Sequence, residues 1–125
     1  MIMTPDTNTI SNKIMGKRWT HYKLEHFFYF NTKTIGRLFD DVGLTGEVRS
    51  LQEYPITNHI NWAYRKTFSD VLAARKGIPN VPVTSRVSLD AWEHLWNEFN
   101  QMYLKYLEDN GFGDRVWCVV GPSGF

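Results

Sequence analysis

The chain has 125 residues, of which 42% are hydrophobic and 22% charged, and this composition is typical of one soluble globular domain and excludes disordered and fibrous classes. Fourteen basic and thirteen acidic side chains leave a formal charge of +1, so no strong field favours nucleic acid or an anionic membrane. The single cysteine, Cys118, excludes an internal disulfide framework.

No targeting or membrane-spanning segment is predicted. The first residues lack the basic region and apolar stretch of a secretory signal peptide, and no apolar run approaches the roughly 20 residues that cross a bilayer. A lone cysteine suits a reducing compartment. We therefore expect a cytoplasmic protein, with neither nucleic acid nor a membrane as its partner.

The first clear element is a helix that begins near residue 32. Residues 1–17 are polar and predict a loop, and residues 19–30 are dense in aromatics, which is typical of an irregular or short-helical segment packed on a core. Asn31 is a capping residue type and Gly43 suits a helix end. Between them lie apolar residues at helical spacing, expected to form one buried stripe: Ile35, Leu38, Phe39 and Val42.

The middle of the chain is predicted to hold a strand and a long loop. Residues 46–54 start at a glycine and end before a proline, which favours a strand. Residues 57–69 fit either a strand or a short helix. Residues 76–87 contain Gly77, Pro79 and Pro82 and are interpreted as a loop insertion within one domain.

A long aromatic helix and a central strand are predicted to complete the chain. Ser88 is a suitable N-cap, and Gly111 would end a helix of about 22 residues. Its apolar residues recur every three or four positions, and such a surface is expected to be buried against something large: Leu89, Trp92, Trp96, Phe99, Tyr103, Tyr106 and Leu107. Residues 115–120 are continuously β-prone, which is typical of a central strand covered on both faces. This order of elements predicts an α/β class.

Two glycine-rich stretches resemble nucleotide-binding turns but lack the required context. Residues 109–113 follow a helix and precede a strand, which is the reverse of the order that points helix amides at a phosphate. Residues 121–124 follow a strand but are not succeeded by the lysine of a phosphate-binding loop. We interpret the first stretch as a helix stop and turn, and expect no cofactor site in this chain.

A small cluster of metal-ligand types is present at His21, Glu25 and His26. On a helix the two histidines would be about 140° apart, so they would not face one metal ion, and neither His59 nor His94 adds a recognisable spacing. We expect no metal site, a structural or hydrogen-bonding role for the cluster, and a solvent-exposed position for His94.

Two early stretches resemble a known enzyme family. They are Gly16-Lys17-Arg18-Trp19 and Glu25-His26-Phe27-Phe28-Tyr29-Phe30, followed by Thr34, Leu38 and Gly43-Leu44. This pattern resembles the C-terminal half of class I S-adenosylmethionine-dependent methyltransferases, in which a Glu-His-aromatic run precedes the helix after the fifth strand. Later stretches resemble one branch of that family: Gln52-x-Tyr54-Pro55-Ile56-x-Asn58-His59 and Tyr103-x-x-Tyr106-Leu107-x-x-x-Gly111-x-x-Asp114.

The resemblance covers nearly the whole chain and implies a partial Rossmann-like fold, from the end of strand five to strand seven. Residues 2–6 would end strand five, residues 46–54 would form strand six, and residues 115–120 would form strand seven, antiparallel to strand six at one sheet edge. The glycine-rich cofactor turn and the first four strands would lie upstream of Met1. Residues 1–125 would then be one partial domain that binds no S-adenosylmethionine alone.

The resemblance also implies where an acceptor substrate would bind. Ligands of open α/β sheets lie beyond the carboxyl ends of the strands, which would place these residues on the substrate side: Thr4, Pro5, Asp6, Trp19 and Glu25. Methyl transfer chiefly needs alignment of the nucleophile with the methyl group, and a hydroxyl or amine acceptor also benefits from a base. His26 would be that base, because an imidazole titrates near neutral pH. Alternatively, a structural Glu25–His26 pair holds the loop.

Three functions therefore remain open at this point. The chain is an inactive acceptor-side portion of a methyltransferase, one subunit of a split methyltransferase whose partner chain supplies the cofactor half, or a small stand-alone α/β interaction module. Because an unpaired strand edge and an uncovered aromatic helix favour association, self-association is expected in each case.

Overall fold

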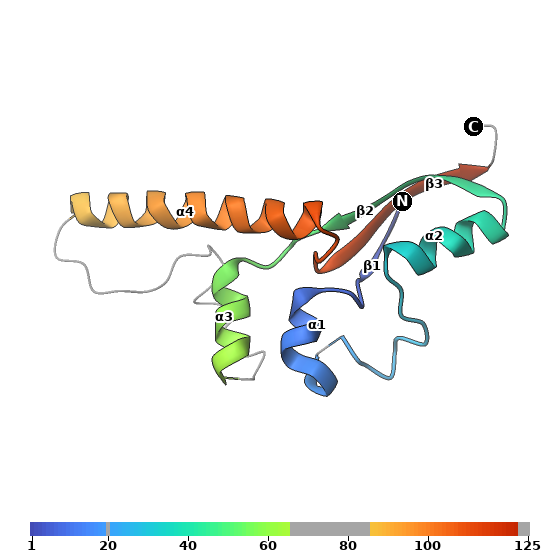
Figure 1. The fold of residues 1–125 in the computed structure, drawn as a ribbon, viewed down its shortest axis with the longest axis horizontal. Helices are drawn as coiled ribbons and strands as arrows, with labels where there is room; N and C mark the ends of the chain where they lie inside the picture. The colour runs from blue at the N-terminus through green and yellow to red at the C-terminus, as the bar shows by residue number, and fades with distance from the viewer. Residues whose placement is uncertain (20, 66–85, 123–125) are drawn as a thin grey trace.

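The computed structural model describes residues 1–19, 21–65 and 86–122 (Figure 1). These residues form three strands, four α-helices and one 3-10 turn: β1 (Ile2–Pro5), α1 (Ile10–Met15), η1 (Gly16–Arg18), α2 (Thr32–Asp41), β2 (Leu44–Leu51), α3 (Ile56–Arg65), α4 (Arg86–Asp109) and β3 (Arg115–Pro122). Helix and strand are mixed, as predicted. Of the predicted loop insertion 76–87, residues 76–85 lie outside the described part, and the last two residues begin α4.

The three strands form one antiparallel sheet in the order β1-β3-β2. Thr4 pairs with Val116 on one side of β3, and Ser50 pairs with Val116 on the other side. The prediction that residues 115–120 form a central strand is therefore confirmed. So is the antiparallel pairing expected between the predicted strands 46–54 and 115–120, although the first of them runs from Leu44 to Leu51.

Helix α2 covers one face of this sheet. Ile35 and Phe39 of α2 pack against Val116 and Cys118 of β3, and all four side chains are buried. The next residue on the other face, Val119, is 45% exposed. The prediction that this strand is covered on both faces is wrong for the described part of the chain, because no described helix packs over the second face as α2 does over the first.

Capping explains why α2 begins and ends where the sequence predicts. The Asn31 side chain accepts hydrogen bonds from the backbone N–H groups of Lys33 and Thr34, and the Thr34 hydroxyl accepts one from the Asn31 N–H. Gly43 follows the helix with a φ of +73°, a conformation that favours glycine. The buried stripe is narrower than predicted: Ile35 and Phe39 are buried, but Leu38 and Val42 are exposed.

The predicted N-terminal loop instead contains β1 and α1. Residues 2–5 form a strand because each lies opposite a residue of β3, a long-range pairing that local composition does not reveal. This strand agrees with the family resemblance, which placed the end of a strand at residues 2–6. Thr9 caps α1, since its side-chain oxygen accepts from the Ser11 N–H. Of the two options for residues 57–69, the helix is observed as α3.

Helix α4 extends away from the sheet along the long axis of the molecule (Figure 1). It begins at Arg86, so Ser88 lies within the helix and the predicted N-cap is wrong. It ends before Gly111, as predicted, where φ is +71°. Within the described residues the aromatic face is only partly covered: Leu107 is buried and Trp92, Trp96 and Tyr103 are half-buried, but Phe99 and Tyr106 are 46% and 61% exposed.

Candidate functional site

The six residues predicted for the acceptor side fall into two neighbouring places. Thr4 and Pro5 are half-buried on β1. The next residue, Asp6, is completely buried, and Trp19 is 2% exposed. The remaining two, Glu25 and His26, lie in the irregular segment before α2, where Glu25 is exposed and His26 is half-buried. The structure thus brings Asp6 and Trp19 to one buried polar network and leaves the other pair in a surface loop beside it.

Asp114 is the centre of the buried network. The Thr9 hydroxyl donates to its Oδ1 at 2.8 Å. Its Oδ2 accepts from the side-chain amide of Gln52 at 2.5 Å and from the backbone N–H of Tyr54 at 3.0 Å. Burial raises the pKa of Asp114, but the interactions with His59, the Tyr54 N–H and the Thr9 hydroxyl together lower it by more. Its net pKa is therefore below the usual value, and the carboxylate is ionised at neutral pH.

His59 and Tyr103 extend the network from α3 to α4. His59 Nε2 lies 3.5 Å from Asp114 Oδ1, and His59 Nδ1 lies 2.6 Å from the Tyr103 hydroxyl. Burial, with a smaller effect of Asp114, raises the pKa of Tyr103 to about 12. The phenol therefore keeps its proton and forms a hydrogen bond with His59 Nδ1, while His59 Nε2 faces the carboxylate.

Trp19 joins the same network through two hydroxyl groups. Its indole Nε1–H donates to Ser11 Oγ at 3.1 Å, and Ser11 Oγ is 3.1 Å from Thr9 Oγ1, which in turn donates to Asp114. The Trp19 ring packs with Met15 and Trp62 in a second core cluster. A residue expected beside the substrate is therefore part of the interior.

Asp6 is the second buried carboxyl group near Asp114. Its Oδ1 accepts from the Asn8 N–H at 2.7 Å, and its buried Oδ2 has no hydrogen-bond partner within the described residues. Burial, reinforced by the charge of Asp114, raises the pKa of Asp6 from 3.8 to about 6. Asp6 is thus in an environment that favours its neutral form more than solvent does, and its complete burial separates it from groups in solvent.

The raised pKa of Asp6 predicts a pH-dependent gain for Asp6→Asn. Because folding raises the pKa of Asp6, the protonated side chain contributes its full stability below about pH 4. This contribution is lost as the pH rises through 6, where the buried group ionises. The amide of Asn does not ionise, so the variant avoids that loss. Its free energy of unfolding should be higher than that of the parent by about 1–2 kcal/mol at pH 8, allowing for solvent screening, and equal to it at pH 4. Urea unfolding at both pH values measures this; an equal difference at the two would contradict it.

The loop that carries His26 is held by its own hydrogen bonds. The Tyr29 hydroxyl accepts from the Lys23 N–H at 3.0 Å and donates to the Lys23 carbonyl oxygen at 3.1 Å, which closes the loop. His26 Nδ1 is 3.0 Å from the His21 carbonyl oxygen. Because a carbonyl only accepts, Nδ1 carries the proton and the lone pair of the neutral ring is on Nε2. This tautomer suits a general base acting through Nε2.

His26 forms its hydrogen bond with the backbone of His21 and not with Glu25. The ring also packs edge-on against Tyr29, with centroids 6.1 Å apart. The described loop is therefore held without the structural Glu25–His26 pair that the sequence offered as an alternative.

His94 is 75% exposed, as predicted, and lies 3.3 Å from Glu98.

The sequence interpretation gave no role to the residues that build the network. Asp114, Gln52, His59 and Tyr103 occur in the stretches that resemble the methyltransferase family, but they are too far apart in sequence for local spacing to bring them together. The one local signal is α3, where Asn58, His59 and Trp62 share a buried face although two of them are polar.

The turn between α4 and β3, which positions Asp114 in the network, depends on Gly113. A Cβ on Gly113 would lie 2.6 Å from the Leu51 carbonyl oxygen, and the Gly113 N–H donates to Ser50 Oγ at 2.9 Å. The turn approaches β2 so closely at residue 113 that a side chain would not fit, which explains the glycine. Residues 109–113 thus form the helix stop and turn that the sequence predicted.

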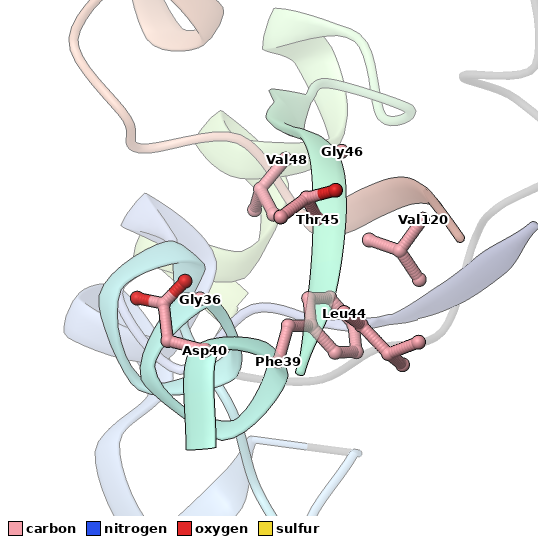
Figure 2. A pocket seen from close by; sticks show the side chains of 8 residues that line it. All are labelled: Gly36, Phe39, Asp40, Leu44, Thr45, Gly46, Val48 and Val120. Carbon is pink, nitrogen blue, oxygen red and sulfur yellow. The ribbon is translucent and has the colours of Figure 1, made fainter. Parts of the chain in front are cut away.

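A hollow of about 230 Å³ lies between α2 and the sheet (Figure 2). Its lining is largely apolar, with Asp40 and Thr45 as the polar side chains: Gly36, Phe39, Asp40, Leu44, Thr45, Gly46, Val48 and Val120. None of the six predicted site residues lines it. In the described ranges, no group of three or more His, Cys, Asp or Glu side chains could hold a metal ion.

None of the described helices combines the length and hydrophobicity needed to cross a membrane. No family model matches the chain, and neither the curated proteins nor the solved structures contain a match to it.

Proposed function

We propose that this chain is the acceptor-side portion of a class I S-adenosylmethionine-dependent methyltransferase and is inactive alone. The observation that carries the proposal is the Glu25-His26-aromatic run followed directly by the capped helix α2, which is the order implied by the family resemblance. The resemblance implies that α2 corresponds to the helix that follows strand five in that family.

The sheet supports the proposal in two respects. β2 and β3 are antiparallel neighbours, as expected of strands six and seven, and β1 ends at Pro5, where strand five would end. The partial Rossmann-like fold, the cytoplasmic location and the need for S-adenosylmethionine in the complete enzyme all belong to this proposal.

His26 would act as the base toward a hydroxyl or amine acceptor. Its Nδ1–H is directed to the His21 carbonyl oxygen, so Nε2 would receive the acceptor proton as the new bond to the methyl group forms. The cofactor would supply the methyl group from its sulfonium, and residues of this chain would orient the acceptor. Asp6 and Trp19 are buried, so the acceptor-side groups with exposed surface are the side chain of Glu25, the half-buried ring of His26, and the half-buried residues Thr4 and Pro5.

The assignment to a larger enzyme is tested by the coding sequence upstream of Met1. We expect an in-frame segment that contains a glycine-rich turn between a strand and a helix. An upstream frame without such a turn would rule out the hypothesis of a truncated enzyme. The split enzyme and the stand-alone module would then remain.

The role of His26 is tested by His26→Ala in the complete enzyme. We expect kcat to fall by a factor of about 100 or more, as is typical when a general base is lost, with an unchanged melting temperature. His94→Ala, which removes an exposed histidine of α4, is the matched control and should leave kcat unchanged. Unchanged turnover in His26→Ala would show that the ring is structural.

The stand-alone module is supported by a different observation. β1 and the second sheet face have no covering strand or helix among the described elements, and such surfaces promote association in an isolated domain. A partner chain that supplies the cofactor half would use the same surfaces.

A further inference from the structure

The backbone of His26 is held in a short turn that one hydroxyl group closes. The His26 N–H donates to the Lys23 carbonyl oxygen at 3.1 Å, which makes residues 23–26 a hydrogen-bonded turn. The Tyr29 hydroxyl donates to the same carbonyl oxygen at 3.1 Å and accepts from the Lys23 N–H at 3.0 Å. Tyr29 therefore binds both backbone groups of the residue to which the His26 backbone is bonded.

The conformation of this turn also determines which nitrogen of the His26 ring carries the proton. His26 Nδ1 lies 3.0 Å from the His21 carbonyl oxygen, which can only accept, so the proton of the neutral ring is on Nδ1. The bond joins residues five positions apart across the turn, so its length depends on the backbone between them. A change in the turn would therefore change the tautomer of His26.

A row of aromatic rings connects the turn to the buried core. The Tyr29 ring packs edge-on against His26 and against Tyr22, with centroids 6.1 and 5.3 Å apart. Tyr22 packs edge-on against the buried ring of Trp19, with centroids 5.1 Å apart. Edge-to-face pairs at such separations are attractive. The rings thus hold Tyr29 in place relative to the interior, and its hydroxyl holds Lys23.

We propose that Tyr29 is a positioning residue for His26: its hydroxyl closes the turn that keeps the ring as the Nδ1–H tautomer, with the lone pair on Nε2. Phenylalanine at this position would keep the ring contacts but would remove both hydrogen bonds to Lys23. The use of Nε2 as a base rests on the proposed function. The control of the tautomer by Tyr29 does not, because every group involved belongs to residues 21–29.

Nitrogen NMR of the His26 ring in this chain tests the proposal. At about pH 8.5 an imidazole is neutral, and the chemical shifts of its two nitrogens report the tautomer. We expect about nine tenths of the ring as the Nδ1–H tautomer in the parent and at most about half in Tyr29→Phe, because water can replace the His21 carbonyl oxygen once the turn is loosened.

Tyr22→Phe is the matched control, because it also removes one hydroxyl group and keeps the aromatic ring. The Tyr22 hydroxyl accepts from the side-chain amide of Asn12 at 3.1 Å, which lies outside the turn. This variant should keep the tautomer of the parent. Three results would each overturn the proposal: a parent ring with its proton on Nε2, an unchanged tautomer in Tyr29→Phe, or an equal change in the two variants.

Turnover of the complete enzyme separates this inference from the proposed function. Tyr29→Phe should lower kcat by at least about twofold, in proportion to the loss of the Nδ1–H tautomer, and leave KM unchanged, because the acceptor still binds but fewer rings offer a lone pair on Nε2. An altered tautomer with unchanged kcat would confirm the positioning by Tyr29 and remove His26 as the base. An unchanged tautomer would remove the positioning role whatever the value of kcat.

Discussion

Asp114→Asn should lower the free energy of unfolding by about 3 kcal/mol at pH 7. The amide that replaces one carboxylate oxygen is a donor, and it would face the donors of Gln52 and Tyr54, or of Thr9 and His59, in an interior where the side chain is 1% exposed. Removing one partner of a buried, hydrogen-bonded charge leaves the other groups unsatisfied, which accounts for an effect of this size. Urea unfolding followed by circular dichroism measures it.

The effect should shrink in acid. The pKa of Asp114 is lowered in the fold, so its stabilising contribution is present above the usual carboxyl pKa and is lost as the pH falls below it. The control is Asp109→Asn, which changes an exposed carboxylate whose ion pair with Lys105 lies on the surface. A loss for this control as large as that for Asp114→Asn would show that the buried network is not what stabilises the fold.

Gly46→Ala should lower the free energy of unfolding by about 2–3 kcal/mol. A Cβ at this position would lie 2.1 Å from the Val119 carbonyl oxygen and 2.7 Å from the Val120 Cα, both backbone atoms of the neighbouring strand. The φ of +156° at Gly46 is also rare for a residue with a side chain. The methyl group would therefore force β2 and β3 apart.

Gly36→Ala is the matched control and should have the opposite sign. Gly36 lies within α2, and a Cβ there would meet no atom within 4 Å. Alanine is favoured over glycine inside a helix, so this variant should gain about 0.5–1 kcal/mol. Thermal unfolding of both variants checks the pair. A neutral Gly46→Ala would mean that β2 does not approach β3 as closely as described.

Local signals were sufficient for the elements whose ends are set by single residues. Asn31 and Gly43 bracket α2 because each makes a contact that depends on its own residue type. The β-prone run of β3 was similarly recognisable as central. In both elements the chemistry that determines the structure lies within the segment.

Elements stabilised by distant partners could not be predicted in this way. β1 is short and includes Pro5, so its residues are typical of a loop until β3 is beside them. Serine is a common N-cap, so the sequence predicts that the last long helix starts at Ser88, but α4 begins at Arg86. The expected cover over both faces of β3 followed from its composition alone, and composition does not show which helices are present.

The same dependence on distant partners applies to the residues of the candidate site. The resemblance pointed to Asp6, Trp19 and His26, and the structure places Asp6 and Trp19 in contact with one network while His26 lies in the adjoining loop. Burial of Asp6 and Trp19 could not be read from their neighbours in sequence. Trp19 is buried against Met15 and Trp62, and Asp6 lies beside Asp114, so both depend on residues that are distant in the sequence.

The central claim is that the methyl-donor pocket belongs to polypeptide outside residues 1–125. Calorimetric titration of this chain with S-adenosylmethionine tests it most directly. The account predicts no saturable heat at ligand concentrations up to about 1 mM, where a site with a micromolar Kd would be filled. Binding with a micromolar Kd, at one site per chain, would contradict it.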